Sequence, residues 1–214
     1  MSKADLSRQI VYVIDDDASL RTSVTRLLRT ADHEVRSFAS AGEFLLAREG
    51  PLRGCLLLDI RMPGGASGLE VYQALVRQAE LLPVIFLTGH GDIPMSVAAI
   101  KAGAFDFLTK PVRAEVLLAT VAAAFARDAG TWAATERRRD LAMRLATLTH
   151  AEYQVYRRVI AGQPNKQITA EVGSAERTVK AHRARVMTKM GALSLAELVH
   201  MADELNGPAF AVSH

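Results

Sequence analysis

The sequence is poor in cysteine and has no long apolar stretch. Its single cysteine, Cys55, lies within an apolar run, so no disulfide can form within the chain and the thiol is typical of a small core residue. Residues 1–5 lack the apolar core of a signal peptide. The longest apolar stretches, such as 116–126, are too short to cross a bilayer. These absences argue against a disulfide-stapled secreted protein or a membrane protein, and they predict a cytoplasmic protein with no membrane partner.

Aromatic residues make up only 6% of the 214 residues, but hydrophobic residues make up 50% and charged residues 23%, which excludes a disordered chain. The formal net charge is +3. Basic residues clearly outnumber acidic ones between Tyr153 and Gly191. Such a concentrated excess favours a polyanion partner for that part of the chain over a merely solvated basic face.

The first half of the chain alternates short apolar runs with helix-like segments. The runs predict buried parallel strands near residues 10–15, 34–38, 55–59, 84–88 and 105–109. The intervening patterns predict helices near residues 18–30, 40–48, 69–79, 93–102 and 112–127. Five such units predict an α/β fold, a doubly wound, five-stranded parallel sheet of the flavodoxin-like kind.

The second half has no strand pattern and predicts a small all-α domain. Helices are expected near residues 150–161, 165–172, 175–190 and 195–205, with a capping box from Ser194 to Glu197. A tight turn before a basic helix predicts a helix-turn-helix unit. The predicted domains are 1–127, a linker 128–147 and 148–214. The linker either continues the preceding helix, which we favour, or breaks near Gly130 and Thr131.

Polar side chains stand where four of the apolar runs stop. They are Asp15, Asp16, Asp59, Thr88 and Lys110. Ligands of open α/β sheets bind outside the carboxyl ends of the strands, so these five side chains should face one crevice. Alone, an aspartate at a strand end usually caps the next helix and a lysine there is usually solvated. Together they predict a site for a hard divalent cation, Mg²⁺ or Mn²⁺, and a phosphoryl group.

The chemistry of a phosphorylatable carboxylate assigns a role to each of these residues. Asp59 is the candidate nucleophile, and Asp15 and Asp16 can hold the metal. Lys110 can pair with one phosphoryl oxygen while Thr88 donates a hydrogen bond to another.

Residues 9–127 resemble a response-regulator receiver domain. The matching motifs are residues 13–17, 58–63, 87–95, 101–104 and 107–111. The resemblance implies phosphorylation of Asp59 by a sensor histidine kinase, metal ligation by Asp15, Asp16, Asp59 and the Arg61 carbonyl, and a cis bond between Lys110 and Pro111. It also implies a switch pair, Thr88 and Phe107, and a dimer face that includes Met95, Val97, Ile100 and Lys101. One departure is an extra residue within 64–66.

Residues from Leu148 onward resemble the LuxR-type helix-turn-helix of FixJ/StyR-like bacterial regulators. The resemblance is carried by residues 148–149, 152, 155, 161–162, 164–168, 177–180, 182–183, 186–187, 189–190, 194–195 and 198–199. Helical spacing gives residues 175–190 an apolar face of Val179, Val186 and Met190. The candidate DNA contacts are Arg177 and Lys180 for the groove, Lys166, Thr178, His182, Arg185 and Lys189 for phosphates, and Arg183 on the same basic face.

Two departures bear on what this second resemblance implies. Ala184 stands where some relatives carry a base-reading side chain, so the operator sequence does not transfer. The last helix, with Leu195, Leu198, Val199 and Ala202, matches the family's dimer helix, although packing within the domain would also use some of these residues.

The two resemblances predict a DNA-binding response regulator of a two-component system, not an enzyme. The expected partners are a sensor histidine kinase, promoter DNA, a second copy on phosphorylation and, as a candidate, RNA polymerase. One alternative is an aspartyl-phosphate phosphatase of the haloacid dehalogenase kind, with Asp15 as nucleophile, although no second acidic motif follows Lys110. The other alternative is a constitutive DNA-binding protein with a vestigial receiver.

Overall fold

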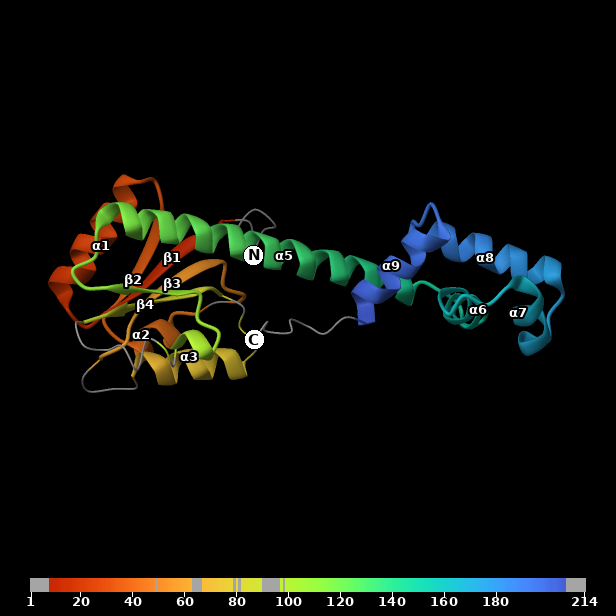
Figure 1. Ribbon diagram of the computed structural model, residues 1–214, viewed down its shortest axis with the longest axis horizontal. Helices are drawn as coiled ribbons and strands as arrows, with labels where there is room; N and C mark the ends of the chain where they lie inside the picture. The colour runs from red at the N-terminus through yellow and green to blue at the C-terminus, as the bar shows by residue number, and fades with distance from the viewer. Residues whose placement is uncertain are drawn as a thin grey trace. The chain divides into compact units, whose positions relative to one another are not determined.

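The computed structural model of the chain describes residues 8–48, 50–62, 67–78, 80, 82–89, 97 and 99–206 (Figure 1). The chain divides into two compact units, the first reaching to Trp132 and the second beginning at Ala133. The predicted 64–66 insertion, residue Met95 and most of the helix expected at 93–102 lie outside the described residues, although Val97 and residues 99–101 have helical backbone.

The first unit is built on a parallel sheet of five strands in the order β2-β1-β3-β4-β5. The strands are β1 (Ile10–Ile14), β2 (Glu34–Phe38), β3 (Gly54–Asp59), β4 (Val84–Thr88) and β5 (Asp106–Thr109). The helices of this half of the chain are α1 (Ala18–Thr30), α2 (Ala41–Leu46), α3 (Gly68–Arg77) and α5 (Ala114–Ala146). The predicted α/β fold, a doubly wound parallel sheet, is confirmed.

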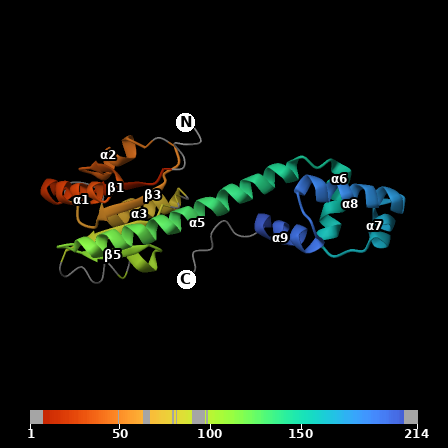
Figure 2. The ribbon, with the colours of Figure 1, turned by 90° about the horizontal axis from the view of Figure 1, so that it is seen from above.

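Helices cover both faces of this sheet, as the two views of the ribbon show (Figures 1 and 2). Successive strand residues alternate between two cores, because side chains in a strand point to opposite faces. On β1, Tyr12 and Ile14 pack with α2 and α3, whereas Val11 and Val13 pack with α1 and α5. Every strand but the edges is therefore buried on both sides, which explains the continuous apolar runs.

Helix α5 has 33 residues, and it includes the segment 128–146 that was expected to link the domains. Gly130 and Thr131 lie inside this helix and do not break it. A Cβ added at Gly130 would have no atom within 4 Å, so the glycine is not needed there to admit a neighbouring segment. The surrounding alanines and arginines favour helix, which offsets the roughly 1 kcal/mol cost of one glycine.

The second unit is all helical. After the end of α5 it contains α6 (His150–Ile160), α7 (Asn165–Val172), α8 (Glu176–Met190) and α9 (Leu195–Asn206). Gly173 ends α7 with φ 64°, a left-handed conformation that a residue with a side chain rarely adopts. This glycine sets the tight turn into α8 where the sequence predicted one. Val155, Ile168, Val179, Val186 and Leu198 form the centre of the apolar core.

Candidate functional site

Parallel register aligns the ends of the strands and so brings the predicted polar residues together. Ile14 of β1 is paired with Leu58 of β3, which places Asp15 beside Asp59. On the other side of β3, Asp59 is paired with Leu87, one residue before Thr88. Thr88 is paired in turn with Thr109, and Lys110 follows directly. Four strands thus deliver their polar residues to one edge of the sheet.

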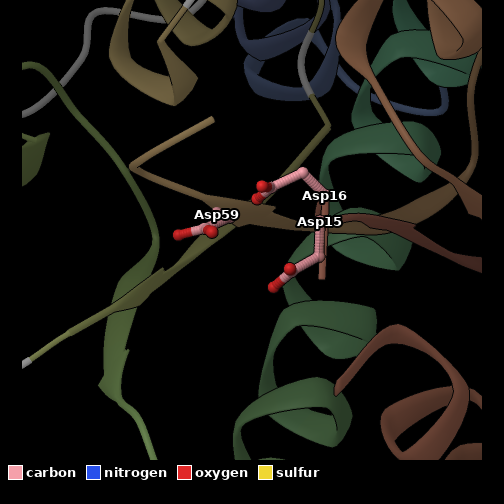
Figure 3. Close-up of side chains that lie close together, drawn as sticks. All are labelled: Asp15, Asp16 and Asp59. Atoms are coloured by element: carbon pink, nitrogen blue, oxygen red, sulfur yellow. The ribbon is translucent and has the colours of Figure 1, made fainter. Parts of the chain in front are cut away.

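Asp15, Asp16 and Asp59 form a group that we call the acidic site. One carboxylate oxygen from each residue lies within 4.8 Å of the others, and Figure 3 shows the three side chains gathered at the strand ends. Asp15 and Asp59 are buried, whereas Asp16 is exposed. Carboxylate oxygens at such spacing suit a hard divalent cation that keeps part of its water shell, so these residues fit Mg²⁺.

The third aspartate of the sequence run has a different task. Asp17 caps α1, and its side chain accepts hydrogen bonds from the backbone N–H groups of Leu20 and Ser19. These two hydrogen bonds lower the pKa of Asp17. Asp15 in turn accepts a bond of 2.9 Å from the Asp17 N–H, which fixes its carboxylate at the mouth of the site. One local turn therefore supports both the helix and the acidic site.

Lys110 joins the two buried carboxylates. Its Nζ lies 2.8 Å from Asp15 Oδ2 and 2.9 Å from Asp59 Oδ2. Burial raises the pKa of Asp59, and the hydrogen bond from Lys110 opposes that rise without cancelling it. For Lys110 burial acts in the opposite direction, but the hydrogen bonds to Asp15 and Asp59 outweigh it and raise its pKa. The lysine is therefore held charged next to the candidate nucleophile.

The remaining residues predicted for this site occupy different environments. Thr88 is 2% exposed and its hydroxyl donates to the carbonyl of Gly89 at 3.3 Å. Phe107 is 39% exposed, so its ring is not a core ring in this structure. The backbone N–H of Arg61 donates to Asp59 Oδ1 at 3.2 Å. The Lys110–Pro111 peptide bond is cis.

Helix α8 separates an apolar face from a basic one. Val179, Val186 and Met190 are fully buried in the core of the second unit, as the helical spacing predicted. The exposed residues among the candidate DNA contacts are Lys166 on α7 and Arg177, Thr178, Lys180 and Arg185 on α8. Lys180 pairs with Glu176 one turn away, but both side chains are largely exposed, so this pair contributes little.

The three other candidate DNA contacts are half-buried, and two of them make hydrogen bonds within the unit. Arg183 donates to the side chain of Asn165 at 3.1 Å, which ties α8 to the start of α7. Lys189 lies 2.6 Å from the buried carboxylate of Glu152 and also donates to the Thr147 carbonyl. His182 is half-buried, and its Nδ1 has no hydrogen-bond partner among the described residues. The exposed set is therefore better placed for an outside partner.

Sequence comparisons match both units to known families. Residues 11–122 match the response regulator receiver domain, and residues 146–202 match the bacterial regulatory proteins of the luxR family. Nodulation protein W of Bradyrhizobium diazoefficiens is 45% identical over 199 residues, covering 93% of this chain and 87% of that protein. Transcriptional regulatory protein FixJ of the same organism is 44% identical, covering 90% of this chain and 93% of its own length.

The comparison of structures agrees. The solved structure of response regulator StyR matches with a TM-score of 0.81 and 43% sequence identity, over 92% of this chain and 99% of that one. The chain belongs to the response-regulator family. It is a two-component regulator of transcription with a receiver domain and a luxR-family DNA-binding domain. This membership rules against the haloacid dehalogenase alternative. Within the described residues, no helix has the length and apolarity needed to cross a bilayer.

The structure of this response regulator adds residues that its sequence did not single out. Arg21 of α1 donates to the backbone carbonyls of Asp15 at 2.6 Å and Asp16 at 3.3 Å, behind the acidic site. Gly68 begins α3 so close to Asp59 that a Cβ would collide with the Asp59 carbonyl oxygen. For Arg21 the sequence held a weak signal, since it lies one helical turn after the capping residue Asp17.

Proposed function

We propose that Asp59 is the residue that accepts a phosphoryl group from a phosphohistidine of a sensor histidine kinase. One observation carries this assignment, namely that Asp59 is buried between two other aspartates and a charged lysine at the carboxyl edge of the sheet. An oxygen of Asp59 forms a bond to phosphorus as the phosphorus–nitrogen bond breaks and its electron pair returns to the imidazole.

The neighbouring residues position and stabilise the transferred group. Lys110 is already within hydrogen-bond distance of Asp59, so its ammonium can stay with the phosphoryl oxygens as charge moves onto Asp59. Thr88, one residue beyond the register partner of Asp59, can turn its hydroxyl from Gly89 to a phosphoryl oxygen. The same groups would serve the later hydrolysis, so the receiver assists both transfers without being an enzyme on an outside substrate.

Asp15, Asp16, Asp59 and the backbone carbonyl of Arg61 would hold a divalent ion, Mg²⁺ or Mn²⁺. The bound ion would supply neutralisation of phosphoryl charge. Two facts favour these ligands: carboxylate oxygens from three residues converge, and Arg61 is already anchored to Asp59 through its N–H. Asp17 is left out of the set because α1 uses its side chain.

The acceptor assignment is tested by intact-protein mass spectrometry after incubation with acetyl phosphate and Mg²⁺. The wild type should gain the mass of one phosphoryl group, and the Asp59→Asn protein should gain none. Asp203→Asn makes the same substitution at an exposed aspartate of α9 and should behave as the wild type. Phosphorylation of Asp59→Asn at an unchanged rate would remove Asp59 from this role.

We propose further that phosphorylation favours a homodimer through the surface beside β5. Val97, Ile100 and Phe107 are 47%, 42% and 39% exposed, and Lys101 is exposed with them. Exposed apolar side chains next to the switch residue Phe107 give a surface whose packing can change when Thr88 and Phe107 move. In the second unit, Leu195 offers an exposed apolar contact on α9, whereas Leu198 and Ala202 are used by the core.

The proposed DNA-binding surface comprises the exposed basic residues of α7 and α8. Lys166, Arg177, Lys180 and Arg185 place four cations on the side of these helices away from the core. Such a surface suits phosphate contacts and groove readout, with Arg177 and Lys180 assigned to the groove. In this proposal Arg183 and Lys189 also position the helix, because they contact the rest of the unit. His182 remains a half-buried candidate for a phosphate contact.

The salt dependence of binding to a labelled duplex of arbitrary sequence tests this surface without knowledge of the operator. Removing one phosphate contact should lower the slope of log affinity against log salt by roughly 0.9. Arg185→Ala should show that change, because its side chain is exposed on α8. Arg139→Ala removes the same charge from α5 and should leave the slope unchanged. Equal slopes for both variants would place the interface elsewhere.

A further inference from the structure

A hollow of about 520 Å³ lies between α1 and β2 of the receiver, and no residue of the acidic site lines it. Its lining is basic and hydroxylic, and consists of Arg21, Thr22, Thr25, Arg26, Arg29, Thr30 and Ser37. It contains three guanidinium groups and no carboxylate. Among the described residues, none of these three arginines forms an ion pair with a carboxylate, so the lining of the hollow is positively charged.

Two of these arginines are held in place by backbone carbonyls. Arg21 donates to the carbonyls of Asp15 and Asp16, and Arg29 donates across to the Val35 carbonyl of β2 at 3.3 Å. A guanidinium has five N–H donors in a planar fork, so these bonds leave further donors for an outside group. Because the carbonyls fix the side chains, less conformational freedom would be lost on binding an anion.

Thr25 supplies a second and independent indication of a ligand. The residue is 8% exposed and lines the hollow, and its hydroxyl has no hydrogen-bond partner in the part of the chain that the structure describes. The neighbouring hydroxyls of Thr22 and Thr30 each donate to a helix carbonyl four residues earlier, but Thr25 does not. A buried hydroxyl normally finds a partner, and here the hollow is the place from which one could come.

We propose that this hollow binds an oligophosphate group, either free or carried by a nucleotide. Arg21, Thr25 and Arg29 follow one another at four-residue intervals, so the Cα atoms of the two arginines are about 12 Å apart along the helix axis. Their guanidinium groups are held by different carbonyls, those of Asp15 and Val35, and a chain of phosphates can contact both more readily than one phosphate can. The planar fork of arginine matches phosphate oxygens in pairs, and the hydroxyls add neutral donors between the charges.

The test follows amide signals of the ¹⁵N-labelled full chain during titration with sodium tripolyphosphate, without Mg²⁺ and at constant ionic strength. The amides of Thr25 and Ser37 should shift and saturate at one ligand per receiver. In the double variant Arg26→Gln/Arg29→Gln the affinity should fall by roughly tenfold or more, because two charged donors are lost. Arg21 is left intact because it also supports the acidic site.

Two further variants separate binding from folding. Arg113→Gln removes an exposed arginine before α5 and should bind as the wild type does. Thr25→Val keeps the shape of the side chain and removes only the hydroxyl, so it should weaken binding severalfold while leaving the spectrum outside α1 and β2 unchanged. If Thr25→Val binds as tightly as the wild type and the double variant does too, the site does not exist.

The choice of ligand identifies the chemistry. ATP and tripolyphosphate should both bind while AMP should not, and tighter binding of ATP would identify a nucleotide as the source. A polyglutamate peptide that shifts the same amides with equal affinity would overturn the oligophosphate assignment. Shifts confined to residues 166–189 would show that only the DNA-binding surface takes the polyanion, and would overturn the site itself.

Discussion

The buried ion pair between Arg53 and Asp128 should dominate the stability of the receiver near the point where α5 leaves it. Arg53 Nε lies 3.0 Å from Asp128 Oδ2, and the two side chains are only 8% and 7% exposed. Gln9 donates to the same carboxylate oxygen at 2.8 Å, and the Arg53 guanidinium lies 4.4 Å from the centre of the Trp132 ring. This network connects α5 to the residues that precede β1 and β3.

Asp128→Ala should destabilise the receiver by about 3–5 kcal/mol, because it removes the carboxylate and leaves a buried guanidinium charge. The loss would be a large share of the roughly 5–15 kcal/mol that stabilises a typical domain. By contrast, the double variant Arg53→Met/Asp128→Leu removes both charges and fills the space with apolar atoms. It should cost much less than the two single changes together, since the desolvation of both charges is removed as well.

Urea unfolding followed by Trp132 fluorescence measures the change in the free energy of unfolding of the receiver. Trp132 is the only tryptophan of the chain, and it stacks on Arg53, so its signal reports the unfolding of the receiver. Far-ultraviolet circular dichroism reports both units in the same samples. Arg113→Met breaks an ion pair whose side chains are about 80% exposed and should cost less than roughly 0.5 kcal/mol. A loss of stability in Asp128→Ala no larger than in this control, or a double variant that loses the sum of the two single changes, would refute the proposed role of the buried pair.

Three other changes test different parts of the molecule. The pKa of Glu152 is lowered from 4.5 to about 2, mainly by the hydrogen bond from Lys189, so the second unit should lose stability as pH falls from about 4.5 to 2. In thermal melts Glu152→Gln should flatten this dependence of stability on pH. A variant whose stability falls with pH as steeply as that of the wild type would contradict this prediction. Gly68→Ala should slow phosphorylation of Asp59 by acetyl phosphate, because its Cβ would displace the Asp59 carbonyl, whereas Gly130→Ala, in open space, should leave the rate unchanged. Ile100→Ser should weaken dimerisation of the phosphorylated protein in sedimentation experiments and leave the phosphorylation rate unchanged, and dimerisation as strong as that of the wild type would exclude this surface.

The sheet and the acidic site followed from the sequence because both depend on short-range patterns. The apolar runs fix which residues form buried strands, and parallel pairing then brings the ends of those strands to one edge. These two patterns were enough to predict that Asp15, Asp59 and Lys110 meet, and in the structure Lys110 Nζ lies 2.8 Å from Asp15 and 2.9 Å from Asp59. The helices of the second unit followed in the same way, with α7 at residues 165–172 as expected.

The partners of the charged residues did not follow, because they depend on contacts between distant parts of the chain. Lys189 pairs with the buried Glu152, which lies 37 positions earlier, a contact that the predicted role at DNA phosphates did not include. Arg53 and Asp128 are 75 positions apart, and no motif or periodicity in the sequence links them. Even Ser194 and Glu197 form only part of the expected capping box, because Glu197 accepts from the N–H of Leu193 instead of Ser194.

The charges of the acidic site explain why Lys110 is held where it is. Three carboxylates and one ammonium leave two net negative charges, which a divalent cation would balance. Phosphorylation of Asp59 would add negative charge beside the same ammonium. Because Lys110 is already 2.9 Å from Asp59 and Asp15 holds it from the other side, it can meet that charge with little movement of its own. The rearrangement on phosphorylation would then fall to Thr88, whose hydroxyl can turn from the Gly89 carbonyl, and to Phe107, whose ring is partly exposed.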